Sequence, residues 1–155
     1  MILNVTARCK KMYSRIILKH TYYKPQIPFI DARLVRNFNF EKLQEVYRTY
    51  CLHKRFHSVM PLFIEEYTYP QSDLHCYFES EELAGFTLLF KYNTTNVAAA
   101  QFAWTYHKPW KQLGIKSLEY LCAYYKAQGY EYLYLGGHEI YKQQLQGYEL
   151  CPPMS

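Results

Sequence analysis

The chain has 155 residues, half of them hydrophobic, so its composition excludes a largely disordered protein and its length allows a normal buried core. It carries a formal net charge of +5 and contains 18 tyrosines. The sequence has no run of about eighteen apolar residues, which is the length of a membrane span. We therefore expect one soluble, cytoplasmic domain with no membrane association.

The positive charge is concentrated near the N-terminus. Residues 1–36 hold eight basic residues and one acidic residue, whereas the remainder holds ten basic and twelve acidic residues. We interpret residues 1–28 as a basic arm and residues 29–155 as the folded domain. Such an arm can bind tRNA or another RNA, and it can equally be a solvated extension.

The cysteines and histidines do not have metal-ligand spacing. The five cysteines are odd in number and widely separated, which is typical of a protein from a reducing compartment. His53 and His57 stand four residues apart, but no third ligand is near them in the sequence. We expect no metal site.

The first half of the chain predicts two strands and a helix. A strand is expected near Tyr13–Leu18, and the alternation in Phe29–Asn37 predicts another. Asn39 can cap a helix that begins near Phe40 and continues to about His53, because apolar residues recur there at three- and four-residue spacing. Leu62–Ser72 is ambiguous.

Three runs with strand character follow, at Leu74–Glu79, Leu83–Tyr92 and Val97–His107. Their short links predict antiparallel hairpins. Strict alternation in the third run places on one face Ala98, Ala100, Phe102, Trp104 and Tyr106. The opposite face then consists of Ala99, Gln101, Ala103 and Thr105. Small side chains let a ligand or another chain approach the backbone closely.

The last part predicts a second helix and a short strand. After the loop Trp110–Gly114, a helix is expected over Ile115–Gln128, with Gly129 as its left-handed cap. Tyr130–Leu135 predicts a strand, followed by a short helical or irregular piece through Gln146. The order of elements predicts an α+β fold in which helices flank a mostly antiparallel central sheet.

The junction between the third run and the second helix is the main candidate binding site. Gly114 is expected in the tight turn, and the first N–H groups of a helix lack intrahelical partners. They can hold phosphate or another anion at the positive end of the helix dipole, and Lys111 and Lys116 would add charge. The alternative interpretation is an ordinary loop with solvated lysines.

This order of strand, basic glycine loop, helix and strand resembles the donor site of the GNAT acyltransferases. The GNAT loop has Gln or Arg, two residues, Gly, one residue and then Gly or Ala. Here Lys111 stands at the first position and Lys116 at the last, which favours an unusual donor over acetyl-CoA. The resemblance implies a donor site formed by Phe102, Trp104, Lys111, Gln112, Leu113, Gly114, Lys116 and Ser117.

The chain also resembles the C-terminal region of the arginyl-tRNA–protein transferases, a GNAT-like branch that takes an amino acid from tRNA. The similar segments, in order across residues 40–153, are Tyr47–His53, Leu83–Leu89, Leu113–Glu119, Tyr132–Gly136 and Tyr141–Pro152. The resemblance implies transfer of an aminoacyl or acyl group from aminoacyl-tRNA or acyl-CoA. The acceptor would be a primary amine on a protein or peptide, such as an N-terminus.

Such a reaction needs an oxyanion donor and groups that move protons. The GNAT pattern implies a backbone N–H near Phe102–Trp104 as the oxyanion donor. It also implies Tyr141 as a tyrosine general acid, with His107 and Tyr106 as further candidates at the strand end. Weaker candidates are His138, Glu119 and Glu139.

The alternative function is that of a catalytically inactive GNAT-like accessory protein. In that case the tyrosine-rich groove and the basic arm would hold a protein or RNA partner, because a fold alone does not determine chemistry.

Overall fold

The structure, a computed structural model, describes residues 13–56, 59–136 and 140–151. These residues form one seven-stranded sheet with the strand order β2-β3-β4-β5-β6-β1-β7. The strands are β1 (Tyr13–Ile17), β2 (Asp31–Val35), β3 (Ser72–Glu79), β4 (Glu82–Lys91), β5 (Asn96–Trp104), β6 (Tyr132–Gly136) and β7 (Tyr148–Cys151). The α-helices are α2 (Phe40–Lys54) and α3 (Leu113–Ala127).

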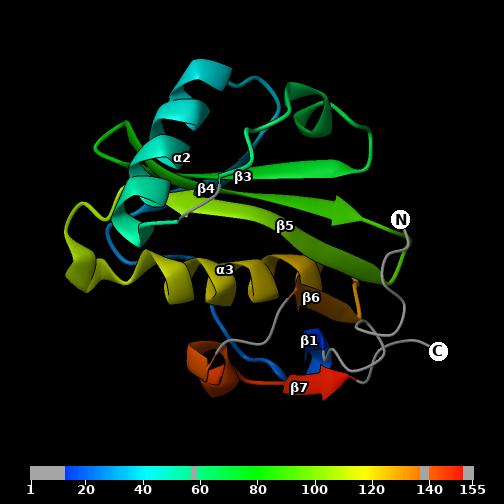
Figure 1. Ribbon diagram of the computed structural model, residues 1–155. Coiled ribbons are helices and arrows are strands. Elements are labelled where there is room, and N and C mark those ends of the chain that lie inside the picture. The colour runs from blue at the N-terminus through cyan, green and yellow to red at the C-terminus, as the bar shows by residue number, and fades with distance from the viewer. Residues whose placement is uncertain (1–12, 57–58, 137–139, 152–155) are drawn as a thin grey trace.

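The two helices lie on opposite sides of the strands β3–β5 (Figure 1). All pairings in the sheet are antiparallel except that of β5 with β6. This architecture confirms the predicted α+β class with helices flanking a mostly antiparallel sheet. Each α-helix has 15 residues, and within the described residues no helix is long and apolar enough to cross a membrane.

Helix α2 begins and ends where its sequence signals predict, within one residue. The Asn39 side chain accepts a hydrogen bond from the backbone N–H of Lys42 at 3.3 Å. Arg55 ends the helix in the left-handed conformation with φ of 56°. Leu43 and Val46 are buried against the sheet, which explains why the apolar stripe predicts this helix correctly.

Helix α3 begins two residues earlier than predicted. Gln112 takes the left-handed conformation at φ of 52°, and Leu113 is already the first helical residue. The expectation that Gly114 forms the tight turn is therefore wrong, because Gln112 forms the turn and Gly114 lies in the first helical turn. Gly129, at φ of 90°, follows the end of the helix as predicted.

A β-bulge changes which residues of β5 share a face. Leu88 pairs with Gln101 and Leu89 with Ala99, so Ala100 has no partner on β4. The extra residue reverses the alternation, and Ala99 packs in the same hydrophobic cluster as Phe102. The expected face that combines Ala100 with Phe102 by strict alternation is wrong, because that prediction assumed an unbroken strand.

The segment that follows the first twelve residues belongs to the sheet. β1 lies between β6 and β7, and Ile16 and Leu18 are fully buried. Residues 13–17 of the expected basic arm are thus part of the sheet, and Arg15 pairs with Glu149 at 2.6 Å. The partner strand β7 is an element that the sequence analysis did not predict. Cys9 and the arm's first basic residues lie outside the described residues.

The core on the α3 side of the sheet contains a buried polar network. His75 on β3 is hydrogen-bonded through Nδ1 to the Tyr120 hydroxyl at 2.8 Å and through Nε2 to the Tyr125 hydroxyl at 2.9 Å. Tyr125 donates its proton to Asp73, so Nε2 of a neutral His75 must donate to Tyr125. Burial lowers the pKa of His75 to about 4.

Candidate active site

Strands β5 and β6 run parallel and separate after a short stretch. Asn96–Ala98 pair with Tyr132–Tyr134, and no further pair joins the two strands among the described residues. β5 nevertheless continues to Trp104. The backbone groups on this edge of β5 lack a strand partner, which is one way for a protein to present N–H donors to a ligand.

Two adjoining cavities lie at this separation. The first, of about 250 Å³, reaches between the strands and is lined by Ala99–Phe102, Leu135 and the start of α3. The second, of about 400 Å³, extends outward over the first turn of α3. The residues that line both are Tyr50, Phe102, Gly114 and Tyr141.

An aromatic cluster forms one wall of the second cavity. The Tyr50 and Tyr106 rings are stacked with centroids 5.9 Å apart, and the His53 ring stacks on Tyr106 at 3.7 Å. Trp104 contacts Tyr106 with centroids 4.5 Å apart. The cluster joins the end of α2 to the end of β5, so it depends on residues about fifty positions apart in the sequence.

The first turn of α3 forms the floor between the two cavities. A Cβ atom added to Gly114 would meet no atom within 4 Å, so this position faces open space. The buried Ser117 hydroxyl donates to the Gly114 carbonyl at 3.0 Å, inside the helix. Lys116 lies 3.4 Å from Glu119, and both residues line the second cavity.

Two lysines of the loop before α3 pair with Glu79, the last residue of β3. Lys111 Nζ donates to Glu79 Oε2 at 2.6 Å, and Lys108 Nζ lies 3.0 Å from Oε1 of the same residue. Hydrogen bonds from Lys111 and Lys108 lower the pKa of Glu79. His107 Nε2 lies 3.8 Å from Glu79 Oε1. The predicted anion-binding Lys111 is thus an internal ion-pair partner, and its side chain is 9% exposed.

The structure brings together most of the residues that the sequence analysis selected. Those that line one or both cavities are Phe102, Trp104, Tyr106, Gln112, Gly114, Lys116, Ser117, Glu119 and Tyr141. Leu113 is buried in the core, and Lys111 and His107 line neither cavity. His138, Glu139 and His57 lie outside the described residues.

Lys142 is a candidate that the sequence analysis missed. Its side chain lines the first cavity although the residue is only 9% exposed, and Nζ donates to the Leu135 carbonyl at 3.3 Å. Its ammonium can donate more than one hydrogen bond, and it lies beside the open edge of β5, where it can also donate to a ligand in the first cavity. Its one sequence signal is the place directly after Tyr141.

The described residues contain no group of three His, Cys, Asp or Glu side chains placed to hold a metal ion. His53 contributes its ring to the aromatic cluster instead.

No protein-family model matches the chain, and neither does any curated protein sequence. Solved structures are similar to it. FemX has a TM-score of 0.70 at 7% identity, over 92% of this chain and 60% of that one. A GCN5-related N-acetyltransferase from Anabaena variabilis has a TM-score of 0.63 at 10% identity, over 92% and 38% of the two chains.

The C-terminal domain of a putative lysylphosphatidylglycerol synthetase from Agrobacterium fabrum has a TM-score of 0.61 at 11% identity, over 82% of this chain and 46% of that one. This chain spans less than two thirds of the length of each of the three structures. The chain has a GNAT-like fold, which agrees with the separated parallel strands and the helix between them.

Proposed function

We propose that the chain is an N-acyltransferase that moves an aminoacyl or acyl group from an activated donor to a primary amine. The observation that carries this proposal is the unpaired edge of β5 where it leaves β6. This edge meets the first turn of α3 and the buried Lys142 at one cavity. Backbone N–H groups and an ammonium around one space suit an oxyanion that develops at a carbonyl.

The proposed reaction forms a C–N bond and breaks a C–O or C–S bond. The acceptor nitrogen attacks the donor carbonyl carbon, and the resulting oxyanion is stabilised by the β5 backbone and Lys142. Collapse of the intermediate releases the donor oxygen or sulfur, and the acceptor nitrogen loses one proton. Tyr141 lines both cavities and is our candidate to protonate the leaving group.

We propose aminoacyl-tRNA as the donor, with acyl-CoA as the competing possibility. The aromatic cluster of the second cavity offers rings on which a terminal base can stack. Lys54 and Lys116 line that cavity and can contact a backbone phosphate. The similar synthetase from Agrobacterium fabrum is named for an aminoacylated product, which agrees with this donor class.

The donor can be identified by thermal shift with charged tRNA, uncharged tRNA and acetyl-CoA. We expect charged tRNA to raise the melting temperature of the wild-type protein the most. Gly114→Ala should fold normally, because the added methyl group meets no atom and alanine favours a helix. It should nevertheless weaken donor binding about tenfold by occupying space that the donor needs.

Gln128→Ala, at the exposed far end of α3, is the matched control and should bind donors like the wild type. If acetyl-CoA alone raised the melting temperature, the donor would be an acyl-CoA and not an aminoacyl-tRNA. Absence of binding by every donor would overturn the enzyme proposal and leave the accessory-protein function, in which the groove holds a partner without transfer.

A further inference from the structure

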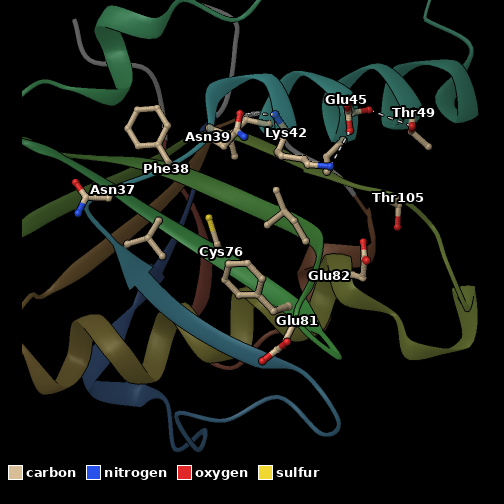
Figure 2. A pocket seen from close by; sticks show the side chains of 15 residues that line it. Asn37, Phe38, Asn39, Lys42, Glu45, Thr49, Cys76, Glu81, Glu82 and Thr105 are labelled. Atoms are coloured by element: carbon tan, nitrogen blue, oxygen red, sulfur yellow. Dashed lines mark hydrogen bonds and ion pairs between the residues drawn. The ribbon is translucent and has the colours of Figure 1, made fainter.

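A third cavity, of about 500 Å³, lies on the opposite side of β5 from the proposed active site. It lies between α2 and the strands β2–β4 and opens to the solvent, and Figure 2 shows its lining. Its volume is within the range of ligand-binding pockets. No step of the proposed transfer uses it.

The floor of this cavity is apolar. It consists of Val35, Leu43, Val46, Cys76, Phe78 and Leu83. Leu43, Val46 and Cys76 belong to the hydrophobic cluster beneath α2, and Phe78 and Leu83 are half-buried beside it. Because Leu43, Val46 and Cys76 are themselves buried, an aliphatic chain inserted here would cover the exposed parts of Val35, Phe78 and Leu83.

Three carboxylates and one ammonium line the same cavity. Glu45 and Lys42, both on α2, lie 3.8 Å apart and offset each other. Glu81 and Glu82, at the turn between β3 and β4, pair with no basic side chain among the described residues. Figure 2 shows the Glu82 carboxylate close to Thr105, at the end of the cavity that borders β5.

An apolar floor with an excess of negative charge at the rim is complementary to an aliphatic stem that ends in a cation. Lysine and arginine side chains have this construction. We propose that the third cavity binds a lysine or arginine side chain of a peptide partner. The cavity volume also accommodates part of the peptide backbone around that side chain.

The place of the cavity suggests what the peptide does there. Thr105 lines the third cavity, whereas its neighbours Trp104 and Tyr106 line the second. A peptide docked through one basic side chain would lie next to the transfer cavities and could present an amine to them. This acceptor role rests on the proposed function, but the docking itself does not.

Direct binding tests the docking without any donor. The probes are fluorescein-labelled, otherwise neutral hexapeptides with a central lysine or arginine, together with norleucine and glutamate versions. Fluorescence anisotropy should show that the basic peptides bind at least about tenfold more tightly than the norleucine peptide, with affinity falling as salt rises. Equal binding of the norleucine or glutamate peptide, or no binding of any peptide, would overturn the proposal.

The variants are chosen so that they remove the carboxylates of the third cavity without unfolding the protein. Glu81 has a left-handed backbone at φ of 69°, so Glu81→Gly relieves strain while it removes a carboxylate. The double variant Glu81→Gly, Glu82→Gln should stay folded and bind the basic peptides about tenfold more weakly. Glu131→Gln, an exposed residue before β6 that lines none of the three cavities, should leave affinity unchanged.

The outcomes distinguish this proposal from the proposed function. If the basic peptides bind and the double variant loses that binding, the docking stands even when no donor supports transfer. If transfer to amines occurs but the double variant transfers and binds like the wild type, the docking fails and the transferase remains.

Discussion

Two segments on either side of the site look alike in the sequence and differ in the structure. Residues 105–112 before α3 carry Lys108 and Lys111, and both lysines pair with Glu79 outside the transfer cavities. Residues 140–144 after β6 carry Lys142, which lies inside the first cavity. The comparison teaches that a lysine in a loop identifies an anion site only when its carboxylate partners are known.

The largest effect expected from this comparison is the loss of Lys142. Lys142→Met removes an ammonium from the cavity but keeps a similar apolar stem. We expect transfer from charged tRNA to a peptide amine, measured with a radiolabelled amino acid, to fall by about 100-fold to 1,000-fold, as when an oxyanion donor is removed.

Lys126→Met is the matched control for that variant. Lys126 also donates to a backbone carbonyl, that of Thr21, but it lines none of the three cavities. Its replacement should leave transfer within about threefold of the wild type. If the two variants had equal activity, Lys142 would have no role in transfer.

The pH dependence of the free energy of unfolding sets the pH range in which variants of the two segments can be assayed on a folded protein. The pKa of buried His75 is lowered from 6.5 to about 4, so the unfolded chain binds the proton first as pH falls. This contribution to stability is complete above pH 6.5 and is lost progressively toward pH 4, by roughly 3 kcal/mol.

Urea unfolding at several pH values checks the size of this effect. The His75→Gln variant should be less stable at neutral pH but should lose less stability between pH 6.5 and pH 4. If the stability of the wild type and of the variant changed equally with pH, His75 would not be held neutral in the folded protein. Kinetic comparisons of the lysine variants belong above pH 6.5, where the core is intact.

A smaller effect is expected from Tyr106, an aromatic residue of the first segment that lines the second cavity. Tyr106 has a φ of 60°, a conformation that asparagine tolerates well, so Tyr106→Asn removes the ring without added backbone strain. Loss of one stacking ring should raise the KM for charged tRNA about tenfold and change kcat little. Tyr92→Asn, an exposed tyrosine in the β4–β5 link, is the control.

The smallest effect is expected from Lys111, the residue that the sequence analysis put in the donor site. Lys111→Met breaks its ion pair with Glu79 but leaves Lys108 to accompany the carboxylate. We expect a change of less than about fivefold in KM for charged tRNA, because Lys111 lines neither transfer cavity. If Lys111→Met lost as much transfer activity as Lys142→Met, Lys111 would have to be part of the donor site.

The sequence predicted the regular elements well because their signals are local. Asn39 and the apolar spacing of Leu43 and Val46 suffice to place α2, and the alternation between residues 74 and 104 suffices for three strands. Tyr141 and Gly114 were selected for a shared site, and both line the two cavities. The donor, the acceptor and the closeness to arginyl-tRNA–protein transferases stay predictions.

The features that could not be predicted from the sequence depend on contacts between residues that are distant in the chain. The bulge at Ala100 depends on how β4 and β5 align, and the pairing of Lys111 depends on where β3 places Glu79. β7 becomes a strand because β1, which the sequence does predict, offers it an edge, although no strand was predicted over Tyr148–Cys151.

The sequence by itself thus determined the fold class, the order of the strands and α-helices as far as β6, and the junction at which a site would form. Propensity, capping and periodicity act over a few residues, so these features can be read locally. Only the tertiary structure decided that Lys142 lines the first cavity and that Lys111 pairs with Glu79, because both depend on contacts between segments that are distant in the sequence. It also revealed the cavity beneath α2, whose lining comes from four separate segments of the chain.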